Sequence, residues 1–454
     1  MNYRTEHDSM GAIEVESERL WGAQTERSRR NFKIGEEKMP LAVIRAFAVL
    51  KSAAAKANRD CGKLAEEKAE LICRVCDEIK SGVLDSEFPL SVWQTGSGTQ
   101  TNMNLNEVIA NRANALAGEK SFHPNDTVNM SQSSNDTFPS ALRIAAVAQI
   151  EECLIPAAER LIAEFKKLEA ENEGIIKVGR THLQDAVPLS LSQEISGWRA
   201  SVKTDISMIK ATLPELSKLA IGGTAVGTGL NAPEGFDTLA AKYISEFSGH
   251  EFVAAENKFR ALSSLSDVAF AHGALRALAC DLLKIANDIR LLSSGPRCGI
   301  GELFIPENEP GSSIMPGKVN PTQCEMVTMV AARVMGNDTT VSFAASQGNF
   351  QLNVYLPVTA YSMLQSITLL SDAMNSFCDN CVVGIKPNKK RIEENLSRSL
   401  MLVTALNGAI GYENAARVAK CAHSEDITLA EAAEKLGLLT KAEAEKLLDP
   451  KKMV

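Results

Sequence analysis

The hydrophobic pattern in the middle of the chain predicts a series of unusually long helices. Between about residues 136 and 385, apolar side chains return every three or four positions over long stretches, which is the spacing of an α-helix. A helix rises about 1.5 Å per residue, so the longest segment would extend about 54 Å, a length typical of a helical bundle. The predicted helices span residues 140–173, with a bend at Pro156, and residues 191–212, 259–294, 322–347 and 357–383.

These helices carry apolar or small residues around most of their circumference. Between Arg260 and Leu292, for example, leucine, isoleucine, valine and phenylalanine are joined by alanine, serine and glycine on nearly every side. A helix that is apolar on most sides is buried on most sides. Five such helices cannot all be buried within one subunit, so we expect a homo-oligomer in which bundles from several subunits pack together. A monomeric bundle is the alternative.

The parts that flank the bundle have a different character. Residues 1–135 are predicted to mix loops with short helices, among them residues 40–60 and 64–80. Near the other end, Thr428–Glu431 and Thr440–Glu443 both fit a capping box, and Gly437 lies where the first of these helices should stop. The pattern therefore predicts an all-α fold of three domains: a mixed helical and loop domain (1–135), a central five-helix bundle (136–385) and a small helical C-terminal domain (386–454).

Composition narrows the choice of partners and compartment. The 454 residues carry a net charge of −8, which argues against a nucleic-acid partner, since such a partner requires a basic face. No run of about 20 apolar residues is present, so no membrane span is predicted. The first residues, MNYRTEHDSMG, are polar and lack the apolar core of a secretory signal. We therefore expect a cytoplasmic protein.

Ten cysteines raise the question of a metal site. Two Cys-x-x-Cys pairs, Cys73/Cys76 and Cys378/Cys381, have a spacing that zinc sites use. The pairs lie far apart in the sequence, in helical patterns and without clustered histidines. We expect reduced, mostly buried thiols and no metal.

The most distinctive stretch of the chain is Gly311–Pro321, GSSIMPGKVNP. Its glycines and prolines predict a loop, and the loop concentrates two hydroxyls, one ammonium and one carboxamide. Asn320 is a favoured N-cap residue, and Pro321 suits the first position of the helix that follows. The loop should therefore end on a helix N-terminus, whose N–H groups favour an anion.

Other polar clusters have a similar composition. Residues 91–104, 123–126 and 131–136 are rich in hydroxyls and amides, which suggests a lining that binds carboxylates. Among the six histidines, His7, His250 and His423 are expected to be solvated, and His272 to be a hydrogen-bonded core residue. His182 lies in Gly179–Pro188, a connection between two predicted long helices. As a lone histidine, His182 would be read as structural.

Two of these motifs resemble the signatures of the fumarase/aspartase superfamily. They are Gly311–Pro321 and the Gly-Arg-Thr-His-Leu-Gln pattern that contains His182. Asp8–Val15 and Leu20–Arg27 look more specifically like the opening of a class II fumarase, and the resemblance runs from about Arg4 to Val454. It implies a homotetramer with a shared twenty-helix core, active sites built from several subunits, and reversible hydration of fumarate to L-malate, as in the tricarboxylic acid cycle. It also implies that neither metal nor organic cofactor is required.

The resemblance assigns roles that the chemistry explains. Removing a proton from carbon beside a carboxylate leaves a carbanion, which is tolerable only as a dianionic aci-carboxylate held by fixed donors. Lys318 and Asn320 are candidates for those donors. The resemblance makes Ser312 the proton-abstracting base, which would need donors from the loop backbone and Lys318 to stabilise its alkoxide. It makes His182, paired with Glu325, the acid/base group for the water at the neighbouring carbon.

Binding residues are carried over in the same way. The resemblance places the substrate against Ser97, Gly98, Thr99, Ser133, Ser134, Asn135, Thr181, Ser313, Lys318, Val319 and Asn320. It places a second, non-catalytic dicarboxylate site at His123, Pro124, Asn125 and Asp126. The chain departs from the pattern in a shortened segment between Asn106 and His123, in Lys120–Phe122, at Gln351 and in Asn407–Gly411.

Two alternatives remain open from the sequence. Aspartate ammonia-lyase, which also releases fumarate, shares the signature loop. A non-catalytic structural protein could share the fold, since fold does not imply function, but it should have lost part of the acid/base set. That set is present here in full: Thr99, Ser134, Asn135, His182, Ser312, Lys318, Asn320 and Glu325.

Overall fold

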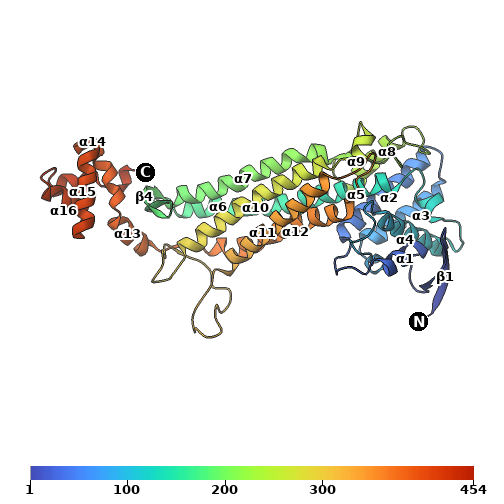
Figure 1. Cartoon of the computed structure of the whole chain (residues 1–454), viewed down its shortest axis with the longest axis horizontal. Helices are drawn as coiled ribbons and strands as arrows, with labels where there is room; N and C mark the ends of the chain where they lie inside the picture. Colours follow the sequence, from blue (N-terminus) through green and yellow to red (C-terminus); the bar gives the residue numbers. More distant parts are fainter. Residues whose placement is uncertain (1) are drawn as a thin grey trace. The chain divides into compact units, whose positions relative to one another are not determined.

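The computed structural model describes residues 2–454 as two compact units, and both are mainly helical (Figure 1). This confirms the prediction of a helical fold. The first unit contains the chain up to Pro156, with Asp205–Ala279 and Ala331–Ser371. The second contains Ala157–Thr204, Cys280–Val330 and Asp372–Val454. None of the helices among the described residues has both the length and the apolar character that crossing a membrane requires.

The first unit begins with a β-hairpin that the sequence analysis did not foresee. Strands β1 (Tyr3–Asp8) and β2 (Gly11–Glu16) pair antiparallel, and their exposed and buried side chains roughly alternate. Arg4 fixes the hairpin to the following chain by donating hydrogen bonds to the carbonyls of Glu16, Arg19 and Trp21. The prediction of only helices and loops here was wrong, because a two-stranded hairpin gives too short an alternating pattern to stand out.

Four α-helices, a 3₁₀ turn and a π-turn follow in the described part of the chain. The predicted helices at 40–60 and 64–80 are confirmed as α2 (Leu41–Asp60) and α3 (Glu66–Lys80). Helix α4 (Thr99–Ala117) was missed, because its Asn102, Asn104 and Asn106 are polar yet buried, so no apolar stripe marks it. The elements are α1 (Ala23–Asn31), α2 (Leu41–Asp60), α3 (Glu66–Lys80), the 3₁₀ turn Asp85–Glu87, α4 (Thr99–Ala117) and the π-turn Pro124–Val128.

The helix is interrupted by a π-turn just before Pro156, and the predicted bend itself stays a prediction. Helix α5 (Ser134–Gln149) passes through a π-turn, Ile150–Leu154, into α6 (Ile155–Glu171). Proline has no N–H to bond to the preceding turn, and such interruptions commonly bend a helix. The helix begins earlier than the predicted residue 140, because a capping box at Ser133 starts it.

Three of the remaining long helices match their predictions closely, and one does not. The predicted helix 259–294 is divided into α9 (Lys258–Ser263) and α10 (Ser266–Leu292). Ser264 has an extended backbone and its hydroxyl accepts a hydrogen bond from the N–H of Ser266, so the serine starts a new helix instead of continuing the old one. The others are α7 (Leu191–Leu216), α11 (Thr322–Ala345) and α12 (Leu356–Asn380).

Within the first unit, His272 is a buried core residue, as predicted. Its Nδ1 lies 3.0 Å from Asp338 and its Nε2 2.9 Å from Ser366. His250, expected to be solvated, instead lies between Glu151 and Glu152. The smaller elements of this unit are α8 (Phe236–Ser248) and the parallel strands β5 (Lys218–Leu219) and β6 (Val253–Ala254).

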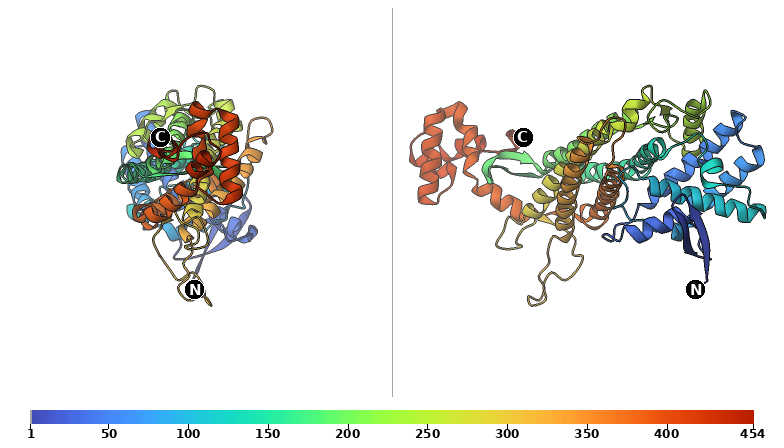
Figure 2. Two further views of the ribbon diagram at one scale, coloured as in Figure 1. Left: turned by 90° about the vertical axis from the view of Figure 1, so that its left-hand side faces the viewer. Right: turned by 45° about the vertical axis from the view of Figure 1, so that its right-hand side comes forward.

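The second unit combines two short strand pairs with a group of C-terminal helices (Figure 2). Leu406, Val418 and Ala433 belong to a small core of that group. Both predicted capping boxes are confirmed at Thr428 and Thr440. The elements are β3 (Ile176–Thr181) with β4 (Gln184–Ser190), β7 (Leu303–Phe304) with β8 (Lys386–Pro387), α13 (Lys389–Arg398), α14 (Asn407–Ile410), α15 (Tyr412–Glu425), α16 (Leu429–Lys435), α17 (Lys441–Leu447), and the 3₁₀ turns Val382–Gly384, Leu400–Leu406 and Pro450–Lys452.

Candidate active site

The predicted signature loop lies between α10 and α11, where the chain leaves the helices in a long excursion (Figure 1). The loop is closed at its base, because the N–H of Gly311 donates to the Lys318 carbonyl at 2.8 Å and the Asn320 carboxamide donates to the Gly311 carbonyl at 2.7 Å. The prediction that Asn320 caps the helix and Pro321 opens it was wrong. Helix α11 begins at Thr322, since the Asn320 side chain closes the loop instead.

Only glycine fits at the base of this loop. A Cβ at Gly311 would lie 2.7 Å from the Lys318 carbonyl oxygen and 2.9 Å from the Asn320 nitrogen. Both of those atoms belong to the backbone and cannot move aside without opening the loop. The glycine therefore permits the closure that defines the shape of the loop.

Ser312 lies just inside the closed loop, with its hydroxyl oxygen directed at the loop backbone. The oxygen accepts hydrogen bonds from the N–H of Ile314 at 3.2 Å and of Met315 at 3.0 Å. Two N–H donors on one hydroxyl oxygen favour negative charge there, and they therefore lower the cost of forming an alkoxide. The loop backbone therefore supplies the expected donors, whereas the Lys318 ammonium donates no hydrogen bond to Ser312 among the described residues, and the role of Ser312 as a base stays a prediction.

Lys318 and Asn320 line a cavity of about 540 Å³, together with Val319. Its wall also includes one further cation, Arg290, and one carboxylate, Glu307. Lys318 is exposed, and within residues 2–454 its ammonium has neither a hydrogen-bond partner nor an ion pair. An unpaired ammonium on a cavity wall is suited to a carboxylate ligand.

His182 lies at the tip of the β3–β4 hairpin, which the sequence analysis had treated only as a connection. His182 and Leu183 form a two-residue turn in which both φ angles are positive, at 56° and 60°. Such turns normally use asparagine and glycine, because a left-handed residue with a side chain costs about 1–2 kcal/mol. Strain of this kind collects at functional sites, so the turn itself supports a role for His182.

In the first unit, Ser97 and Thr99 lie at the start of α4. Their hydroxyl oxygens are 2.8 Å apart, and Gly98 between them has φ +71°. A Cβ on Gly98 would lie 2.0 Å from the Phe138 ring, so the close approach requires glycine. The predicted substrate loop is thus a helix N-terminus, where the first N–H groups favour an anion.

Ser133, Ser134 and Asn135 lie at a second helix N-terminus, that of α5. Ser133 is the N-cap and forms a capping box with Asp136. The Ser134 hydroxyl accepts a hydrogen bond from Asn102 of α4 at 3.0 Å. Two of the three predicted polar clusters are therefore brought together at adjoining helix starts.

A buried cation behind this cluster was missed by sequence reasoning. Lys51 is only 1% exposed, and its ammonium donates to the side-chain oxygens of Asn129 and Gln132 at 3.0 and 2.9 Å. Burial lowers the pKa of Lys51 to about 7. Burial also raises the pKa of Asp136 to about 6, against N–H donors from the backbone. The sequence signal was a lysine among the small and apolar residues of helix α2.

The residues predicted for a second dicarboxylate site lie at the π-turn Pro124–Val128. His123 precedes the turn, and its Nδ1 accepts a hydrogen bond from the N–H of Asp126 at 3.2 Å. His123, Asn125 and Asp126 are exposed. The second site stays a prediction.

Several predicted partners do not meet within one chain. His182 and Glu325 are both exposed, and neither side chain has a hydrogen bond or ion pair with any other residue in the described range 2–454. Thr181 and Ser313 are exposed as well. The pairing of His182 with Glu325 therefore stays a prediction that would require a second copy of the chain.

The predicted zinc alternative gains no support. Among the described residues, no group of three or more histidine, cysteine, aspartate or glutamate side chains is arranged to hold a metal ion. No disulfide joins the cysteines in residues 2–454, and within that range only Cys76, Cys324, Cys378 and Cys381 are buried. The prediction of mostly buried thiols is therefore only partly correct.

Comparison with known proteins identifies the family. Residues 11–336 match a family described as lyase, and residues 402–454 match the fumarase C C-terminus. The chain is 59% identical to the class II fumarate hydratase of Bacillus subtilis and 58% identical to that of Campylobacter jejuni, each over all of this chain and 99% of the relative. The crystal structure of a class II fumarase from Schistosoma mansoni superposes with a TM-score of 0.98 at 41% identity, covering 100% of this chain and 99% of that one. The chain belongs to the class II fumarate hydratase family.

Proposed function

We propose that this chain catalyses the reversible hydration of fumarate to L-malate, with Ser312 as the base and His182 as the acid/base group at the neighbouring carbon. The observation that carries the proposal is the closed loop, which directs two N–H donors at the Ser312 oxygen and leaves the Lys318 ammonium unpaired. The relatives that share the whole length of the chain are named for this reaction.

The proposed chemistry follows from these groups. In the dehydration of malate, the Ser312 alkoxide removes a proton from the carbon beside one carboxylate. The electron pair moves into that carboxylate, and Lys318 and Asn320 stabilise the resulting dianion by charge and by hydrogen bonding. The hydroxyl group on the next carbon leaves as water after taking a proton from His182, which we propose is paired with Glu325.

The assembly is also part of the proposal. A homotetramer with a twenty-helix core and shared active sites would bring His182 and Glu325 to partners that one chain does not supply. Large apolar side chains on the long helices are exposed, including Phe270 at 58%, Met329 at 67% and Phe343 at 59%. Such surfaces are typical of interfaces between subunits. The three-domain division, the cytoplasmic location and the independence from metal stay predictions.

One assay separates the two enzymes considered from the sequence. We expect the purified chain to release fumarate from L-malate and to leave L-aspartate unchanged, as followed by the ultraviolet absorbance of fumarate. Release of fumarate and ammonia from aspartate would instead indicate aspartate ammonia-lyase. Inactivity toward both substrates would favour the structural protein.

Lys318→Met should lower kcat and raise KM together. A cation that contacts the substrate carboxylate acts in the ground state and in the transition state, and loss of such a group typically costs about 100-fold in kcat. The measurement is steady-state kinetics with malate. Lys390→Met is the matched control, since Lys390 is an 88% exposed lysine of α13. Unchanged kcat and KM in the Lys318 variant would remove Lys318 from the site.

A further inference from the structure

We propose that Glu302 is a positioning residue that holds the β3–β4 hairpin so that its turn presents His182 to the substrate. The inference rests on the proposed acid/base role of His182. It concerns a residue that precedes the signature loop and lies far from His182 in the sequence.

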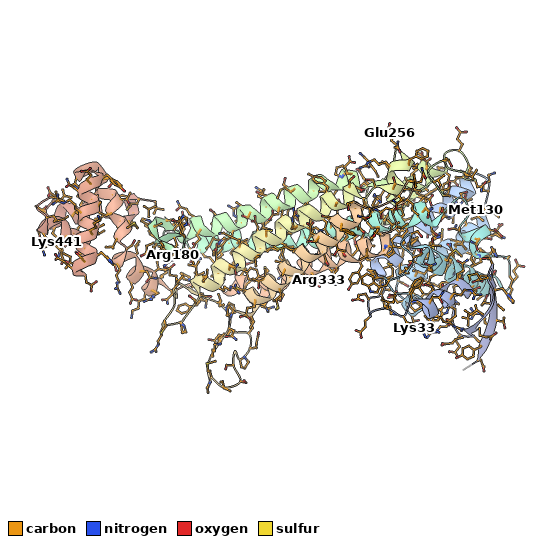
Figure 3. All side chains as sticks on the ribbon, in the orientation of Figure 1. Lys33, Met130, Arg180, Glu256, Arg333 and Lys441 are labelled. Carbon is orange, nitrogen blue, oxygen red and sulfur yellow. The ribbon has the colours of Figure 1, made fainter. Side chains whose placement is uncertain are left out.

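The Glu302 carboxylate is the centre of a buried cluster. The side chain is 0% exposed, and both of its oxygens accept hydrogen bonds from the Arg180 guanidinium, at 2.7 and 3.0 Å. Lys177 lies 3.3 Å away, and Asn395 of α13 donates at 3.0 Å. Arg180 and Lys177 are both on β3, so one carboxylate fixes the strand that leads into the turn. Figure 3 labels Arg180 on this strand pair.

Glu302 is itself held in place by its backbone. Its N–H donates to the carbonyl of Leu292, the last residue of α10, at 2.8 Å. Its carbonyl accepts a hydrogen bond from the N–H of Asn388, just before α13, at the same distance. These two hydrogen bonds tie the Glu302 backbone to the end of α10 and to the residue before α13, and they therefore restrict the position of its carboxylate.

The charges of the cluster are balanced. Lys177 also pairs with Glu194 at 3.0 Å, so two cations face two carboxylates. Burial alone would raise the pKa of Glu302, but Arg180 and Lys177 outweigh burial and hold that pKa below its ordinary value. Glu302 is thus ionised near neutral pH, and a bidentate bond of this kind fixes direction as well as distance.

The turn that follows Arg180 has a strained backbone, so an ion pair that holds the strand before it is important for its position. His182 and Leu183 adopt left-handed conformations that their side chains disfavour, and Leu183 is 75% exposed, so packing does not hold it. β3 also bulges between Val178 and Arg180. The ion pair between Glu302 and Arg180 therefore holds β3 at a point two residues before His182.

Glu302 also connects the hairpin with the signature loop. Its neighbours in sequence, Gly301 and Leu303, line the same cavity as Lys318 and Asn320. Glu302 therefore lies between the strand that leads to His182 and the segment that leads to the signature loop.

The test is Glu302→Gln, which keeps the shape and removes the charge. We expect kcat with malate to fall about 10- to 100-fold while KM changes less than about twofold, since misplacing a catalytic group by about 1 Å can cost 10²-fold. Activity is measured per folded protein, with folding monitored by circular dichroism. The matched control is Asp267→Asn, which removes the charge of another buried carboxylate bonded twice to an arginine, Arg143. This control should lose thermal stability but retain kcat.

A double-mutant cycle separates positioning from general support. If Glu302 acts through His182, Glu302→Gln should lower kcat no further in a His182→Ala background. A full, additive loss in that background would overturn the inference and leave the role of His182 standing. Unchanged kcat in His182→Ala alone would contradict the proposed function as well as the inference.

A second variant covers the case in which Glu302→Gln does not fold. Arg180→Lys keeps the charge and loses the two-pronged hydrogen bond, and it should show the same fall in kcat and the same absence of effect in the His182→Ala background. Parent-like kcat in folded Arg180→Lys would overturn the inference.

Discussion

Ser312→Ala is expected to lower kcat for malate by roughly 10²- to 10⁴-fold, the usual contribution of a general base, while leaving the fold intact. The serine side chain is small and partly exposed, and among the described residues its hydroxyl oxygen accepts hydrogen bonds only from the loop's own backbone. The loop closure between Gly311 and Asn320 uses other atoms and should survive the substitution. The N–H groups of Ile314 and Met315 would then face solvent, which can hydrate them.

The measurement is kcat at saturating malate, together with the melting temperature. Ser397→Ala provides the matched control, because Ser397 is an exposed serine of α13 whose hydroxyl donates a hydrogen bond to the Glu394 carbonyl in the preceding turn. If the Ser312 variant keeps more than half of the parent's kcat, Ser312 is not the base.

Two inactive variants, His182→Ala and Ser312→Ala, are expected to restore activity to each other when they are combined in the proposed tetramer. Within one chain, the His182 side chain forms no hydrogen bond or ion pair with the signature loop or with any other residue in the described range 2–454. If each site takes its histidine from one subunit and its serine from another, a randomly mixed oligomer holds both intact groups in roughly a quarter of its sites. The two variants are unfolded, mixed in equal amounts and refolded together.

Recovered activity should approach about one quarter of the parent's, as random assembly of a symmetric oligomer requires. Each variant refolded alone is the control, and native mass spectrometry confirms that mixed tetramers are present. Recovery no greater than the controls, with mixed tetramers confirmed, would show that a single subunit supplies both groups.

The long helices could be predicted closely because their signal is long. Residues 322–347 and 357–383 were predicted, and α11 and α12 run from Thr322 to Ala345 and from Leu356 to Asn380. Their ends are set by local residues, whereas the break at Ser264 depends on a single hydroxyl that competes with the helix. Helix α4 buries polar residues, so its pattern resembles that of a loop.

Some of the candidate site residues could also be predicted from the sequence, and others could not. Ser312, Lys318 and Asn320 stand in one short stretch, so their grouping was already visible in the sequence. The environments of Lys51 and Glu302 depend on residues distant in the chain, such as Gln132 and Arg180. A buried ion pair between distant segments leaves no periodic signal in either, and it emerges only once the chain is folded.

The closure of the signature loop has a thermodynamic consequence. A free loop must give up conformational entropy when it folds over a ligand, and that loss weakens binding. Here the hydrogen bonds between Gly311, Lys318 and Asn320 have joined the ends of the loop before any ligand arrives. The attraction between Lys318 and a carboxylate is therefore not consumed in ordering the loop, and more of it remains to stabilise the charge that develops during the reaction.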